Sequence, residues 1–137
     1  MLNHSERRIN PSTLEDSLRF AKNADLVTLV CAETSTTGAA IARLDPNMIA
    51  IEPPDLIGSG TSVSRARPEL LTDSLKGIRK VSSTIKVLCG AGITTSEDVS
   101  KALQLGTEGV LVASSVVKSR DPSRVLNEMA DAVLKIK

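Results

Sequence analysis

The sequence of 137 residues has almost no aromatic side chains, with no tryptophan, no tyrosine and a single phenylalanine, Phe20. Its hydrophobic core must therefore be built from leucine, isoleucine, valine and alanine. Small aliphatic cores of this kind suit parallel strands covered by helices, because such strands are buried on both faces. The length corresponds to one domain, so we expect residues 1–137 to form a single unit.

The sequence also lacks an excess of charge of either sign, since 17 basic and 16 acidic residues leave a formal net charge of +1. This balance gives no electrostatic reason to expect nucleic acid or an anionic membrane as a partner. No apolar run is long enough to span a bilayer, and residues 1–4 do not resemble a signal peptide. We therefore predict a soluble, cytoplasmic protein with no nucleic-acid or membrane partner.

Cysteine is scarce, with only Cys31 and Cys89 in the chain. Each ends a predicted strand, and neither has a CxxC partner or the spacing of a metal-ligand set. We interpret both as buried, reduced thiols. We expect neither a metal ion nor another cofactor.

What the sequence does contain is a regular alternation of short apolar runs with helical patterns. The predicted strands are 26–31, 48–51, 86–89 and 110–113. The predicted helices are 12–23, 36–44, one from Pro68, one opened by Thr94 and Glu97 up to Gly106, and one from Asp121 with Ile136 facing inward. Connections this short require each strand to run parallel to the next, with right-handed crossovers. The predicted class is an α/β fold of four consecutive parallel βα units.

The most informative stretch is 48–60, where a short apolar strand ends in a carboxylate, Glu52. A carboxylate at the end of a buried strand lies where apolar walls meet solvent, and such a group can act as a base. Two prolines then stiffen the chain, whereas Gly58 and Gly60 let a ligand approach the main chain. This pattern favours a hinged lid over an anion site. The alternative is an ordinary strand-to-helix connection with one solvated carboxylate.

Small residues follow the other strands as well, at 31–33, 89–92 and 113–115. The carboxyl ends of parallel strands are where α/β proteins place their ligand sites. Alanine, glycine and serine expose main-chain N–H groups, and the helices that follow point their positive ends to the same place. Together these clusters indicate a phosphate site, although Gly90-Ala91-Gly92 alone is more often just a tight turn.

Four motifs occur in a fixed order: NHSERR at 3–8, EPPDLIGSG at 52–60, CGAGI at 89–93 and LVASSV at 111–116. In this order they resemble triosephosphate isomerase of the archaeal type. The resemblance implies the C-terminal half of a (β/α)8 TIM barrel, from the end of the fourth strand through the eighth helix. The chain would then comprise four βα units plus a strand stub at 1–3.

The resemblance also implies roles for individual residues. Glu52 would be the catalytic base that moves a proton between two carbons of dihydroxyacetone phosphate or glyceraldehyde 3-phosphate, a step of glycolysis and gluconeogenesis. His4 would be the neutral electrophile, Ser5 would hold Glu52 while the lid is open, and Glu6 would support the site. The lid would be 54–60, and the phosphate would rest on main-chain N–H groups, those of Gly58, Gly92, Ala113 and Ser114. Outside the NHSERR context, His4 would be interpreted as a frayed residue near the chain start.

Half a barrel lacks parts that the family uses. A complete barrel has eight strands, and the family's Asn-x-Lys, which stabilises negative charge and binds the phosphate, has no counterpart here. A lone half would expose inward-facing side chains and two sheet edges. We therefore expect a complementary N-terminal half-barrel chain, a second copy of the same chain, or an open half held by helix contacts. Without the complement, isomerase activity should be near background.

Two alternatives stay open at this stage. The first is a half-barrel module that binds phosphate or has a structural role, self-associates and does not catalyse. The second is another phosphate-binding barrel enzyme, of the aldolase or indole-glycerol type. Lys86 begins a strand instead of ending one, so no Schiff-base lysine is evident, and the pair of His4 and Glu52 argues against this second alternative.

Overall fold

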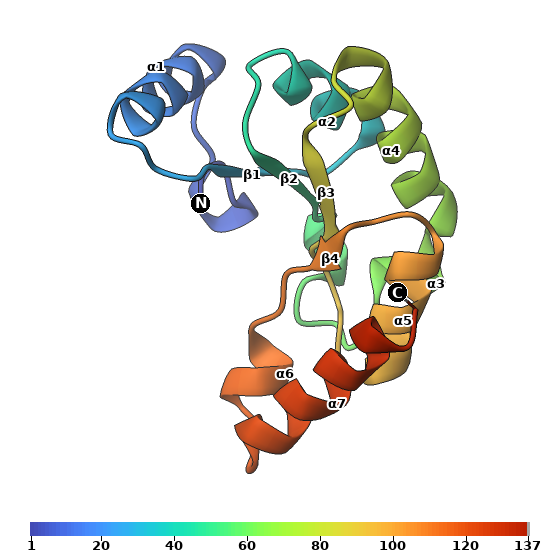
Figure 1. Cartoon of the computed structure of the whole chain (residues 1–137). Helices are drawn as coiled ribbons and strands as arrows, with labels where there is room; N and C mark the ends of the chain where they lie inside the picture. The colour runs from blue at the N-terminus through green and yellow to red at the C-terminus, as the bar shows by residue number, and fades with distance from the viewer. Residues whose placement is uncertain (137) are drawn as a thin grey trace.

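A computed structural model of the chain describes residues 1–136 and contains one parallel sheet (Figure 1). Its four strands lie in the order β1-β2-β3-β4, so each strand pairs with the next one in the sequence. The strands are β1 (Leu29–Ala32), β2 (Met48–Ile51), β3 (Lys86–Cys89) and β4 (Gly109–Val110). The predicted succession of parallel βα units, as in half of a (β/α)8 barrel, is therefore confirmed.

Helices connect the strands, and the longer ones lie along one side of the curved sheet (Figure 1). They are η1 (Ser5–Arg7), α1 (Pro11–Asn23), α2 (Ser35–Ala42), η2 (Pro54–Leu56), α3 (Val63–Ala66), α4 (Pro68–Val81), α5 (Ser96–Gln104), α6 (Ser114–Val117) and α7 (Pro122–Leu134). Helices α2 and α4 pack together beside β2 and β3, and α7 packs on α5 below β4. No helix among the described residues is long and apolar enough to cross a membrane.

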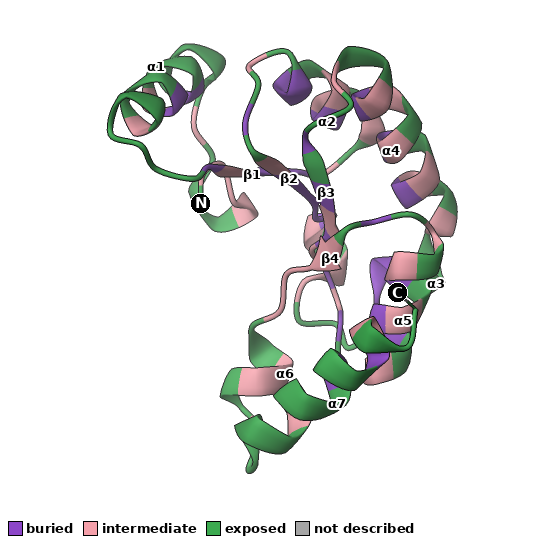
Figure 2. Ribbon diagram, viewed as in Figure 1, coloured by how far each residue is buried: buried purple, intermediate pink, exposed green. Residues whose placement is uncertain are grey.

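The core lies between the sheet and these helices, and Figure 2 colours the buried residues of both purple on the ribbon. Ile49 and Val87 project from neighbouring strands toward Leu71 and Ile78 of α4, and all four are fully buried. The core is aliphatic, as the composition predicts. Side chains alternate along a strand, so Leu29, Met48 and Leu88 face the opposite side and remain partly exposed.

The strand stub at 1–3 contributes one residue to the sheet. Leu2 forms a parallel bridge with Val30: its N–H donates to the carbonyl oxygen of Leu29 at 2.8 Å, and its carbonyl accepts from Cys31 N–H at 3.0 Å. This bridge occupies part of the β1 edge and leads the chain directly to His4.

The first predicted strand is wrong at its start, since β1 begins at Leu29 and not at residue 26. Leu26 and Val27 are 61% and 71% exposed. The N–H of Leu26 donates to the carbonyl of Ala21 at 2.9 Å, so this residue is bonded to the C-terminal end of α1 and not to the sheet. The last strand is also shorter than predicted: β4 ends at Val110, and only Leu111 adds one further bond, to Cys89.

Two predicted helix starts are displaced because another residue provides the cap. Asn10, and not Ser12, caps α1: its side chain accepts from Thr13 N–H at 2.9 Å, and proline occupies the first helical position. In α5 the reciprocal cap joins Thr95 and Asp98, one residue after the predicted pair. A capping motif read from spacing alone cannot distinguish two threonines in succession.

The last helix begins as predicted, with the Asp121 side chain accepting from Arg124 N–H at 3.0 Å. Met129 and Ala132 are buried, whereas Ile136, predicted to face inward, is 38% exposed because α7 ends at Leu134. Helices α3 and α6 were not predicted, since four residues are too few to show a helical period.

Candidate active site

A pocket of about 560 Å³ opens at the carboxyl ends of the strands. Six of the predicted site residues line it together: His4, Glu52, Gly58, Gly92, Ala113 and Ser114. They arrive from the stub and from the loops after β2, β3 and β4, because parallel strands all end at the same edge of the sheet. The structure thus brings into one cavity residues that lie up to 110 positions apart in the sequence.

Glu52 is the buried carboxylate of this pocket. Its N–H donates to the carbonyl of Ala32 at 2.7 Å and so continues the hydrogen-bond ladder beyond β2. This bond fixes the backbone position from which the side chain extends. The side chain is only 5% exposed, and Oε2 has no hydrogen-bond partner within residues 1–136. A buried carboxylate oxygen without a donor is free to accept a proton.

A glycine makes room for this carboxylate. A Cβ added at Gly90 would lie 3.2 Å from the Cβ of Glu52 and 3.3 Å from the Cβ of Ala50. Both distances are shorter than ordinary van der Waals contact. A larger residue at position 90 would therefore push against the end of β2, from which Glu52 follows.

His4 faces Glu52, with Nε2 at 3.4 Å from Oε2. It caps the single turn η1, and its Nδ1 accepts the N–H of Glu6 at 3.3 Å. A nitrogen that accepts a hydrogen bond carries no proton, so in the neutral imidazole the proton is on Nε2, directed at the pocket. His4 can therefore donate to a ligand oxygen while Glu52 accepts a proton beside it.

Asn3 holds this turn in place and was not singled out from the sequence. Its Nδ2 donates to the carbonyl of Cys31 at 3.1 Å, and its Oδ1 accepts from Ile9 N–H at 3.2 Å. The side chain thereby ties both ends of the His4 turn to β1. Asn3 also has a positive φ of 58°, a conformation that asparagine tolerates better than most residues.

Ser5 and Glu6 lie outside the main pocket. Ser5 lines a small neighbouring depression that Glu52 also borders, and no hydrogen bond joins the two side chains in the described chain. The side chain of Glu6 is 87% exposed, with Oε2 at 3.9 Å from His4 Nδ1. Their predicted supporting roles remain predictions.

The four residues expected to bind phosphate all line the pocket. Within residues 1–136, the N–H groups of Gly58, Gly92, Ala113 and Ser114 donate no hydrogen bond to the chain itself. Gly58 and Gly92 share a φ of +71°, which other residues rarely adopt. Unpaired N–H groups in a concave wall are suited to an anion.

Lys118 also lines this pocket and was not predicted. It follows Ser114 by four residues, which is one helical turn, and this spacing is the signal that could have revealed it. Lys86, by contrast, lines a separate cavity near the amino ends of the strands. Among the described residues no group of three or more histidine, cysteine or acidic side chains could hold a metal ion.

The two thiols are buried, and neither forms a disulfide. Burial raises the pKa of Cys31 to about 12, and the negative charge of Glu52 beside it adds to this shift. Burial likewise raises the pKa of Cys89 to about 12. Both side chains are therefore protonated near neutral pH.

We expect both thiols to resist alkylation in the folded chain at pH 7.5, because the thiolate is the reactive species. With Ellman's reagent, fewer than about one thiol in a hundred should react during the time in which the urea-unfolded chain reacts completely. Equal rates with and without urea would contradict the buried, protonated state of both side chains.

The sequence model of triosephosphate isomerase matches residues 1–132 of the chain. The chain belongs to the triosephosphate isomerase family. The triosephosphate isomerase of Archaeoglobus fulgidus is 48% identical over 129 residues, and that of Methanosarcina acetivorans is 47% identical over the same length. Both alignments cover 94% of this chain and 58% of the relative. The triosephosphate isomerase of Cenarchaeum symbiosum is 47% identical over 133 residues, 97% of this chain and 60% of the relative.

Solved structures similar to this family member are more distant in sequence. Thiamine phosphate pyrophosphorylase from Pyrococcus furiosus superposes with a TM-score of 0.70 at 17% identity, over 95% of this chain and 57% of that one. An archaeal fructose 1,6-bisphosphate aldolase superposes with a TM-score of 0.66 at 18% identity, over 90% of this chain and 51% of that one. At such identities the likeness concerns the fold alone. The chain thus spans somewhat more than half the length of the triosephosphate isomerases that it resembles.

Proposed function

We propose that the chain provides the base, the electrophile and part of the phosphate site of a triosephosphate isomerase. In this proposal it interconverts dihydroxyacetone phosphate and glyceraldehyde 3-phosphate when the remaining barrel strands are present. The observation that carries the proposal is the pair of His4 and Glu52, 3.4 Å apart at the wall of a pocket with unpaired N–H groups. Membership of the family and the order of the four motifs support it.

The chemistry requires a proton to leave one carbon of the substrate and to reach the next. Glu52 Oε2, which has no donor bonded to it among the described residues, takes the proton from the carbon that carries the hydroxyl group. His4 donates a hydrogen bond from Nε2 to the carbonyl oxygen and stabilises the charge that develops there. Glu52 then returns the proton to the neighbouring carbon, while the hydroxyl proton passes to the former carbonyl oxygen through His4 Nε2. The two transfers together complete the isomerisation without a metal or an organic cofactor.

The phosphate anchors the substrate away from these two side chains. Gly58, Gly92, Ala113 and Ser114 offer main-chain donors, and Lys118 adds a positive charge at the same pocket. The tip of the lid contributes Gly58, so that closing the lid over a bound phosphate would exclude water and protect the enediolate.

The partner in this proposal is a chain that completes the barrel. Residues 1–137 act as one (βα)4 half-barrel domain, and the uncovered side chains of Leu29, Met48 and Leu88 support contact with further strands. These strands come from a complementary N-terminal half or from a second copy. The triose phosphate substrate and the free thiols both suit the cytoplasm.

We expect isomerase activity near background for the isolated chain, and activity at least about a hundredfold higher after addition of a chain carrying the missing four strands. Light scattering on both samples reports the mass, and a coupled assay reports turnover. Full turnover by the isolated chain would contradict the need for a complement. A well-folded 1:1 complex without activity would favour the module that binds phosphate but does not catalyse.

A further inference from the structure

The C-terminal end of the lid is attached to the turn between β3 and α5. The N–H of Val63 donates to the carbonyl of Ala91 at 3.1 Å. A Cβ at Gly92 would lie 1.9 Å from the carbonyl oxygen of Thr61 and 2.9 Å from the Cα of Ser62. The two segments therefore touch backbone to backbone, at the residue that offers an N–H group to the pocket.

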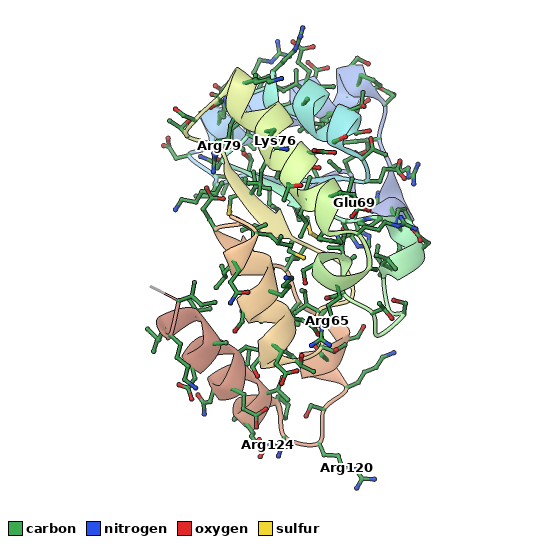
Figure 3. All side chains as sticks on the ribbon, turned by 90° about the vertical axis from the view of Figure 1, so that its right-hand side faces the viewer. Arg65, Glu69, Lys76, Arg79, Arg120 and Arg124 are labelled. Carbon is green, nitrogen blue, oxygen red and sulfur yellow. The ribbon has the colours of Figure 1, made fainter. Side chains whose placement is uncertain are left out.

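A buried carboxylate holds these segments together. The side chain of Asp98 is 4% exposed, and its Oδ1 lies 2.6 Å from Nε of Arg65, which belongs to α3 (Figure 3). Its Oδ2 accepts the N–H groups of Thr94 and Thr95, each at 3.0 Å. We call Arg65, Thr94, Thr95 and Asp98 the Asp98 cluster.

The carboxylate of this cluster is ionised. Burial by itself would raise the pKa of Asp98, but the hydrogen bonds from the Thr94 and Thr95 N–H groups and from the Thr94 and Ser62 hydroxyls outweigh burial and lower it. The charge is therefore available to Arg65 at neutral pH. Because the two oxygens have separate partners, one caps α5 and the other reaches the lid.

The tip of the lid has no such attachment. Around Gly58 and Gly60 an added Cβ would meet no atom within 4 Å among the described residues. Among the described residues, the Ser59 hydroxyl donates to the carbonyls of Leu56 and Thr61 and accepts the N–H of Thr61, all within the same loop. Within the described chain the tip is therefore bonded to its own loop, whereas the end at 61–65 is bonded to the turn after β3.

We propose that Asp98 is a positioning residue that, through Arg65, holds the C-terminal end of the lid against the turn that presents the Gly92 N–H group. This inference rests on the proposed function, since it assigns Asp98 to the phosphate site of that enzyme. Asp98 touches no substrate. It keeps the lid donor of Gly58 and the turn donor of Gly92 in register, so that one phosphate can be bound by both.

The neighbouring acid provides a matched control. Glu97 also pairs with Arg65, at 3.2 Å, but its side chain is 80% exposed. An exposed pair of this kind contributes little, whereas a buried carboxylate that loses its partner is costly. Arg65→Met removes the lid contact and leaves the Thr94 and Thr95 cap of α5 intact, so a loss of helix does not confound the result.

The test uses the complete chain with inorganic phosphate as the probe. Phosphate affinity follows from the shift of the Gly92 amide in NMR titrations, and hydrogen exchange reports opening at the Val63 amide. Arg65→Met and Asp98→Asn should each weaken phosphate binding about tenfold and speed Val63 exchange about tenfold. Glu97→Gln should change both by less than about twofold.

A purely structural role would lower the unfolding midpoint without these local effects. If Arg65→Met leaves both the phosphate affinity and the Val63 exchange rate within twofold of the unsubstituted chain, the inference is wrong. If the unsubstituted chain binds no phosphate, the proposed function loses its phosphate site, and Val63 exchange still decides whether Asp98 holds the lid. In the completed barrel, Arg65→Met should raise KM more than it lowers kcat.

Discussion

Replacing Glu52 by glutamine is expected to lower isomerase turnover in the completed barrel by about a thousandfold. Glutamine has the same shape and can still contact His4, but its amide cannot accept the substrate proton. The measurement is kcat in the coupled assay, with phosphate affinity determined separately. Phosphate affinity should change by less than about threefold, since the main-chain donors are untouched.

Glu33 is the control for this substitution, because it is also a carboxylate at the end of a strand. It pairs with Arg8 at 2.7 Å on the protein surface and does not line the main pocket. Glu33→Gln should leave kcat within about twofold. Equal losses for the two variants would mean that Glu52 acts through general charge balance and not as the base.

Stability should respond to Glu52→Gln in the opposite direction from activity. Oε2 of Glu52 is buried without a donor among residues 1–136, and a buried polar atom without a hydrogen-bond partner opposes folding. An amide is less costly to bury than a carboxylate. We expect the urea midpoint of the variant to equal or exceed that of the unsubstituted chain, which would identify Glu52 as a residue retained for chemistry at the expense of stability.

Gly92→Ala is expected to be the most destabilising single substitution at the site, at about 3 kcal/mol. The residue has a φ of +71°, and its new Cβ would lie 1.9 Å from the carbonyl oxygen of Thr61. That atom belongs to the backbone and cannot rotate away as a side chain would. The turn and the lid end must separate, which breaks the bond from Val63 to Ala91.

Gly58→Ala separates the cost of backbone strain from the cost of the contact between the added Cβ and the backbone. Gly58 has the same φ of +71°, but nothing lies within 4 Å of an added Cβ in the described chain. Its substitution should cost only the backbone strain, about 1 kcal/mol. Urea unfolding of both variants gives the difference directly. If the two lose equal stability, the contact between Gly92 and Thr61 is not tight in solution.

The parts of the fold that were predictable are those in which one local signal dominates. The limits of β2 and β3 match the prediction: β2 is a four-residue apolar run between Asn47 and Glu52, and β3 ends where Gly90 follows its apolar residues. The predicted start of β1 was wrong because Leu26 and Val27 continue the apolar run of the strand, yet Leu26 is bonded to the end of α1 and both side chains are exposed.

The convergence of the site could be anticipated because parallel strands must end at one edge, whatever their side chains. The contacts that hold the site in place could not be predicted from the sequence. Asn3 bonds to Cys31, which is 28 residues away, and Arg65 bonds to Asp98 across 33 positions of sequence. Neither spacing has a local pattern. The spacing predicted Thr94 and Glu97 as the helix cap, and Asp98 was not singled out. Only the fold shows that the Asp98 carboxylate both caps α5 and reaches the lid.

The order of the strands also bears on when each part of the protein can form. Every strand pairs with the one synthesised next, so β1 and β2 can join while α4 is still being made at about 5–20 residues per second. Contacts between sequence neighbours close small loops and form early. The free edge of β4 has no such neighbour in the described chain. Its pairing with any further strand joins segments that are not neighbours among these residues, and contacts of large sequence separation form more slowly.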